Sequence, residues 1–158
     1  MKVEIINSFI KALESTLNEN GGFVLYCKGK KALNCVNINK KVAIIIDLFG
    51  KSTIHGKVII TMKEEIAQKI IGFLLGGAVV SEIDSMGVSA LGEYGSWVVS
   101  SATTNVQEFG EKITDFKVDI ETNLEGIEDK EVYCYGKPFI SLEYLIDNHD
   151  IELSVAVS

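Results

Sequence analysis

The stretch from Ser85 to Gly110 sorts its side chains into two arcs when it is drawn as an α-helix. One arc is apolar, and the opposite arc carries one glutamate together with hydroxyl and amide side chains. This pattern predicts a long helix that buries one side and exposes the other. The apolar arc holds Val88, Leu91, Tyr94, Val98, Val99, Ala102, Val106 and Phe109. The polar arc holds Glu93, Ser96, Ser100, Thr103, Thr104 and Gln107.

Two further helices are predicted on either side of a group of short strands. Apolar residues recur at three- and four-residue spacing from Val3 to Leu17 and from Lys63 to Leu75, and each stretch ends near glycines. The other apolar runs are short and rich in residues that favour strands. The expected strands are Phe23–Cys27, Ala32–Ile38, Val42–Phe49, Ile54–Met62, Ile113–Glu121, Glu131–Tyr135, Phe139–Ile146 and Ile151–Val157.

The order helix, strands, two helices, strands indicates an α/β (α+β) fold. We expect a mixed or largely antiparallel sheet packed with long helices. The chain has 158 residues, of which 47% are hydrophobic, and one domain of this length can bury a proper core. No repeat, low-complexity tract or linker divides it. The sequence therefore predicts a single domain over residues 1–158.

The charge of the chain excludes some classes of partner. It has 22 acidic and 15 basic residues, for a formal net charge of -7, which disfavours nucleic acid and anionic lipid. No apolar run approaches the roughly 20 residues of a membrane span, and no secretion signal is expected. The three cysteines lack C-x-x-C spacing, and neither histidine has a second ligand nearby. We expect a cytoplasmic protein without a metal site.

The long helix holds the strongest candidate for a functional site. Glu93 and Ser96 are three residues apart, so their side chains share the exposed face. The nearby residues Gly92, Gly95 and Ser100 are small, so this face is expected to be flat. Such a surface would let another protein approach closely. The alternative is an ordinary solvated helix face, which most helices have. Phosphate-binding loops, nucleophile elbows and H-E-x-x-H motifs do not occur in the sequence.

Several segments of the chain match the motifs of one known protein family. Asn7-Ser8-Phe9 is similar to the Asn-Pro-Phe element of that family's opening helix, without the proline. Gly56–Met62 resembles its Gly-x-Val-x-Ile-x-Met strand, and Leu74–Gly76 resembles the end of the following helix. The diagnostic Gly-Glu-x-x-Asn motif is matched by Gly92–Ser96, with Glu93 on the family glutamate and serine on the family asparagine. By these segments the chain resembles the CheX group of the CheC, CheX and FliY chemotaxis phosphatases.

The resemblance implies hydrolysis of the aspartyl phosphate on a response-regulator receiver domain like CheY. In that family the glutamate pairs with a receiver lysine, the asparagine orients water, and the receiver supplies the Mg²⁺. The resemblance thus assigns catalytic roles to Glu93 and Ser96, partner contacts to Gly92, Gly95 and Ser100, no cofactor to the chain itself, and a homodimer formed through the sheet. Trp97 borders the polar arc; it is either an aromatic contact for the partner or a half-buried packing residue.

The serine leaves two functions open within the same resemblance. A serine hydroxyl is shorter than an asparagine carboxamide and offers fewer hydrogen-bonding groups, so it would hold water less well. One reading is a phosphatase with weakened turnover; the alternative is a receiver-binding or scaffolding module without catalysis. A third class, a domain of this fold that recognises an unrelated protein or small ligand, also stays open because fold does not determine function.

Overall fold

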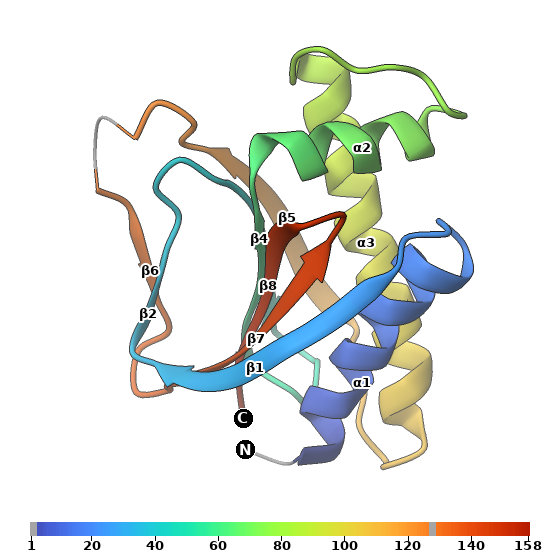
Figure 1. Ribbon diagram of the computed structural model, residues 1–158. Coiled ribbons are helices and arrows are strands. Elements are labelled where there is room, and N and C mark those ends of the chain that lie inside the picture. Colours follow the sequence, from blue (N-terminus) through green and yellow to red (C-terminus); the bar gives the residue numbers. More distant parts are fainter. Residues whose placement is uncertain (1–2, 127–128) are drawn as a thin grey trace.

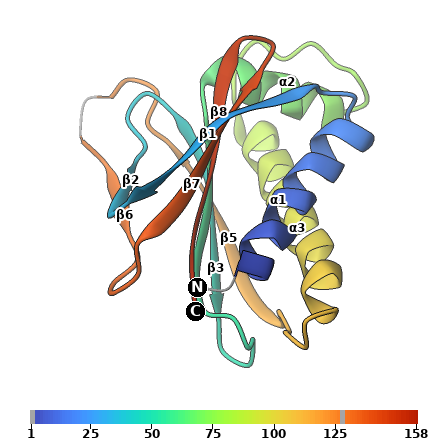
Figure 2. The ribbon, with the colours of Figure 1, turned by 60° about the horizontal axis from the view of Figure 1, so that its bottom comes forward.

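A twisted sheet separates a layer of helices from a small two-stranded ribbon in the computed structural model, which describes residues 3–126 and 129–158 (Figure 1). Figure 2 shows the three layers from another side. The helices are α1 (Val3–Glu14), which continues into a π-helical turn (Ser15–Glu19), α2 (Glu64–Leu74) and α3 (Ser85–Gln107). The strands are β1 (Leu25–Leu33), β2 (Cys35–Asn37), β3 (Val42–Phe49), β4 (Gly56–Met62), β5 (Asp115–Thr122), β6 (Glu131–Tyr133), β7 (Phe139–Ile146) and β8 (His149–Val157).

The main sheet has six strands in the order β1-β7-β8-β4-β3-β5, and every neighbouring pair in it is antiparallel. Strands β1 and β5 are its edges. All three helices lie on one face, where α1 packs beside α3 and α3 lies over β3 and β5. This arrangement confirms the predicted α/β fold with long helices on an antiparallel sheet.

The helix layer is tied together around Tyr94, whose side chain is fully buried. Its hydroxyl lies 2.8 Å from the Thr16 hydroxyl, which also donates to the carbonyl of Ala12. Burial raises the pKa of Tyr94, so the phenol stays protonated and can share a hydrogen bond. This hydrogen bond joins the π-helical turn after α1 to the buried side of α3.

The opposite face of the sheet is partly covered by the antiparallel ribbon of β2 and β6. Apolar residues of this ribbon and the sheet form a second, smaller core, because strand residues alternate between the two faces. The central strands β3 and β4 therefore read as nearly continuous apolar runs. This second core consists of Val36, Ile38, Ala43, Ile45, Ile59, Phe139 and Ala156.

The predicted break between Phe23–Cys27 and Ala32–Ile38 was wrong, because β1 runs without interruption through the lysines between them. A β-bulge between Cys27 and Gly29 absorbs the irregularity, and the strand pairs with β7 on both sides of it. Lys28 and Lys31 are accommodated because acidic side chains of β7 and β8 lie close to them across the sheet. The predicted strand Ala32–Ile38 was also wrong, because β1 ends at Leu33 and β2 (Cys35–Asn37) pairs with β6 in the separate ribbon. The remaining predicted elements agree with the structure to within a few residues, with α3 ending at Gln107.

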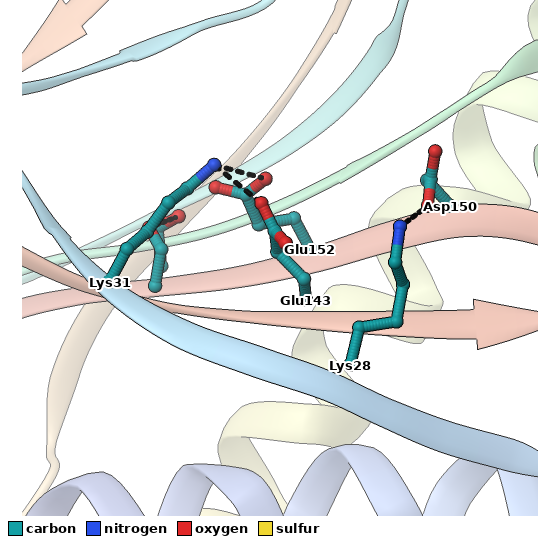
Figure 3. Close-up of polar contacts among 7 residues, drawn as sticks. Lys28, Lys31, Glu143, Asp150 and Glu152 are labelled. Atoms are coloured by element: carbon teal, nitrogen blue, oxygen red, sulfur yellow. Dashed lines mark hydrogen bonds and ion pairs between the residues drawn. The ribbon is translucent and has the colours of Figure 1, made fainter.

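Two groups of ion pairs join β1 to its neighbours, as Figure 3 shows. The Lys31 ammonium group lies 2.6 Å from a Glu143 oxygen and 3.8 Å from a Glu152 oxygen. Farther along the strand, Lys28 lies 3.2 Å from Asp150. The hydrogen bond from Lys31 lowers the pKa of Glu143, and the same bond raises the pKa of Lys31.

These shifts predict an acid-sensitive contribution to stability. The lowered pKa of Glu143 means that its pairing stabilises the fold above the ordinary value of 4.5, and this contribution is lost as pH falls through the lowered pKa. Because the pair is solvent-screened, Glu143→Gln should reduce the unfolding free energy by only about 0.2–1 kcal/mol at pH 7. Urea denaturation at pH 7 and pH 3 measures this difference, which should be smaller at pH 3 than at pH 7.

A double-mutant cycle provides the control. In a Lys31→Gln background the Glu143→Gln change should have no further effect at pH 7, since its main partner is gone. An equal loss of stability in both backgrounds would contradict the assigned pairing.

Candidate functional site

The polar face of α3 begins just after a well-formed helix start. Asp84 is the N-cap, and its carboxylate accepts a hydrogen bond of 2.9 Å from the backbone N–H of Gly87. An N-cap acceptor satisfies one of the unpaired N–H groups of the first turn. The helix therefore starts at a defined residue, and this fixes which positions face outward two turns later.

Glu93 and Ser96 lie together on the outward side of α3, as predicted. Glu93 is exposed and Ser96 is half-buried. Across the residues that the structure describes, neither side chain has a hydrogen-bond or ion-pair partner. Ser100, one turn farther along, is exposed and donates from its hydroxyl to the backbone carbonyl of Ser96, at 3.1 Å. Glu93 and Ser96 are thus available to a partner.

The two glycines of the motif have different surroundings. A Cβ at Gly92 would meet nothing within 4 Å, so this position is open to an approaching molecule. Gly95 instead faces the sheet, where a Cβ would lie 2.7 Å from Val118 Cγ1 and 2.9 Å from Ile44 Cγ2. Gly95 is buried and does not reach the surface that Gly92 and Glu93 share. Its structural role is to let α3 lie close against β3 and β5.

Trp97 is half-buried and packs toward α2 and the interior of the helix layer. Its ring lies edge-on to Tyr94 at a centroid distance of 6.1 Å, and 6.5 Å from the ring of Phe73. These contacts correspond to the packing alternative for this residue. The structure does not place Trp97 in the groove beside Glu93 and Ser96.

The structure adds three residues that the sequence analysis did not select, Ser89, Phe116 and Val118. A shallow groove beside the polar face is lined by Ser89, Gly92, Glu93, Ser96, Phe116 and Val118. Phe116 and Val118 come from the edge strand β5 and pair with residues of β3 that are buried under the helices. The alternation of Phe116, Val118 and Ile120 was a signal for their common face. Their position next to α3 required the strand order.

The groove can supply two kinds of interaction. Glu93 is its one charged residue among those described and can pair with a cation. The Ser96 hydroxyl can both donate and accept a hydrogen bond, and so can hold a water molecule. Within residues 3–126 and 129–158, no group of three or more His, Cys, Asp or Glu side chains is placed to hold a metal ion. No helix in these same ranges is long and apolar enough to cross a membrane.

Comparisons with known proteins agree with this fold. The CheY-P phosphatase CheX of Thermotoga maritima is 21% identical over 113 residues, which cover 72% of each chain. A CheC-like superfamily protein from Shewanella sp. PV-4 superposes with a TM-score of 0.83 at 17% identity, over 100% of this chain and 99% of that one. CheX in the CheX-CheY-BeF3-Mg²⁺ complex from Borrelia burgdorferi superposes with a TM-score of 0.67 at 19% identity, over 99% of both chains.

The family model described as chemotaxis phosphatase CheX matches residues 42–144. This range runs from the start of β3 into β7 and contains the whole of α3. The matched part therefore includes the helix with Glu93 and Ser96 as well as the edge strand that lines the groove. The chain belongs to the CheX family of chemotaxis phosphatases.

Proposed function

We propose that this protein binds a phosphorylated receiver domain through the outward face of α3 and accelerates hydrolysis of the receiver's aspartyl phosphate. The observation that supports the proposal is that Glu93 and Ser96 lie side by side on an open face of α3, in a chain of the CheX family. Two relatives support the choice of partner. One is named a CheY-P phosphatase, and the other is a CheX solved together with CheY and Mg²⁺. We place this activity in the cytoplasm.

In the proposed mechanism Glu93 docks the helix and Ser96 positions water. The Glu93 carboxylate pairs with a cation of the receiver, which brings Ser96 to the phosphoryl group. The Ser96 hydroxyl accepts a hydrogen bond from a water molecule and holds it in line with the phosphorus atom. Phosphoryl transfer asks a catalyst mainly for positioning and charge stabilisation. The Mg²⁺ that supplies much of that charge belongs to the receiver. The chemistry proposed for this chain at the phosphoryl group is therefore limited to water positioning by Ser96, with Glu93 docking the helix.

A second candidate function is receiver binding without catalysis. The observation in its favour is Ser96 itself, which stands where the family motif has asparagine and whose oxygen is held closer to the helix than a carboxamide would be. Binding through Glu93 would survive this change, whereas turnover would be reduced. The protein would then sequester a receiver or hold it in an assembly.

One assay separates the two functions. Each receiver encoded by the same genome is phosphorylated with a small phosphodonor, and phosphate release is followed with and without this protein. Accelerated release supports the phosphatase, and binding without acceleration supports the sequestering module. If no phosphorylated receiver binds, both proposals are wrong.

We also propose, from the family relationship, that the protein forms a homodimer through its sheet. The sheet has an edge strand, β1, on the side opposite the proposed groove, and the outer backbone groups of this strand are not paired within the described residues. Light scattering after size-exclusion chromatography should give twice the chain mass of 17.3 kDa. A mass of one chain over the whole accessible concentration range would contradict the dimer.

A further inference from the structure

The apolar wall of the groove beside Glu93 extends the proposed site beyond α3. We infer that Phe116 on the edge strand β5 is a docking residue for the phosphorylated receiver, so that the site is a groove between helix and strand. This inference rests on the proposed function. The site then consists of two chain segments, α3 and β5. The matching surface of the receiver carries a cation with an apolar side chain next to it.

The first observation is the exposure of Phe116. Its side chain is 37% exposed, although it lies on the face of β5 that the helices cover. The next residues on that face, Val118 and Ile120, are half-buried and pack against the main core. Phe116 therefore remains accessible beside the polar face of α3, where it lines the same groove as Glu93 and Ser96. Aromatic residues, phenylalanine among them, are enriched in the cores of protein–protein interfaces relative to the rest of the protein surface.

The second observation is how closely helix and strand approach. Because Gly95 has no side chain, α3 can lie close against Val118. Phe116, on the same strand as Val118, therefore lies beside the polar face of α3. On the other side of Glu93, the open space at Gly92 keeps the groove shallow and accessible. Since β5 is a sheet edge, no further strand of the described chain covers this wall.

The third observation is the distribution of charge. Glu93 is the single charged residue among those that line the groove, and the rest are small, hydroxyl or apolar residues. A carboxylate beside an apolar wall attracts a cation more strongly once a partner excludes water from the wall. The fitting partner surface therefore carries a positive group and, beside it, an apolar side chain that covers the ring of Phe116.

The test is a substitution that removes the ring and keeps strand propensity. Phe116→Thr should raise the KM for the phosphorylated receiver, or its Kd if turnover is absent, about tenfold, which corresponds to about 1.4 kcal/mol. The single-turnover rate at saturating protein should stay within about twofold of wild type, because the ring does not contact the reacting atoms. Phe116→Leu, which keeps an apolar side chain, should restore most of the affinity.

Phe109→Thr is the matched control, because Phe109 is also an exposed phenylalanine (49%) but lies beyond the end of α3 and outside the groove. Its affinity should equal that of wild type. Unchanged affinity in Phe116→Thr, an equal loss in Phe109→Thr, or a loss of maximal rate in place of affinity would overturn the inference. If the wild-type protein binds no phosphorylated receiver, the proposed function falls and this inference falls with it. If the wild type binds and Phe116→Thr binds equally well, only the inference is overturned.

Discussion

Ser96→Asn is expected to raise the rate of receiver dephosphorylation about 100-fold at saturating protein. The carboxamide reaches farther from the helix than the hydroxyl and adds two donors to its acceptor. One positioning contact of this kind is worth about 10²–10³ in rate. The open position at Gly92, one turn before Ser96, leaves room for the longer side chain. The measurement is phosphate release in a single turnover, with the phosphorylated receiver limiting.

The control places an asparagine at another exposed position of the polar arc. Thr104→Asn puts an identical carboxamide on the same side of α3, but roughly 16 Å along the axis from Glu93. This variant should show the wild-type rate. If Ser96→Asn leaves the rate unchanged, or if both variants raise it equally, Ser96 is not the position that holds the water. If the wild type is inactive and Ser96→Asn is active, the sequestering function describes the natural protein.

Reversing the charge at Glu93 is expected to remove receiver binding. Glu93→Lys would place a cation opposite the cation of the receiver, and like charges across an interface cost several kcal/mol. The affinity for the phosphorylated receiver should fall by at least about 100-fold, which is about 2.7 kcal/mol. Because Glu93 is exposed and its side chain forms no hydrogen bond or ion pair among the described residues, the fold should be unaffected. Isothermal titration calorimetry measures the affinity, and circular dichroism verifies the fold.

The control for net charge is Glu108→Lys. Glu108 is exposed at the C-terminal end of α3, roughly 20 Å along the axis from Glu93, and its reversal changes the net charge of the chain by the same amount. Binding should be retained in this variant. Equal losses in the two variants would show that overall charge governs the association. Retained binding in Glu93→Lys would remove the proposed docking mode.

The main elements could be predicted because each has a strong local signal. The two arcs of α3 and the alternation along β7 both follow from burying one side of a regular backbone. The prediction failed at Lys28–Lys31, where three lysines and a glycine suggested a break in the strand. The acidic partners of Lys28 and Lys31, on β8 and β7, are more than 100 residues away in sequence. Local patterns do not contain such pairings.

For the site as well, features set by local spacing could be predicted, and features set by contacts between distant segments could not. Glu93 and Ser96 could be placed on one face from their spacing alone, because three residues nearly complete a helical turn. The different surroundings of Gly92 and Gly95 could not be predicted. They depend on Val118 and Ile44, which come from strands on either side of α3 in the sequence. Phe116 was missed for the same reason, since only the order of the strands brings β5 beside the helix.

The close seating of α3 on the sheet has a consequence for how such a protein can diverge. Tyr94 and Gly95 hold the helix from within, and their immediate neighbours Glu93 and Ser96 project outward without supporting the core. The outward residues can therefore be exchanged at little risk to folding. We propose that Ser96, which the motif resemblance aligns with the family asparagine, is one such exchange, made beside an inner position, Gly95, that has no room for a side chain.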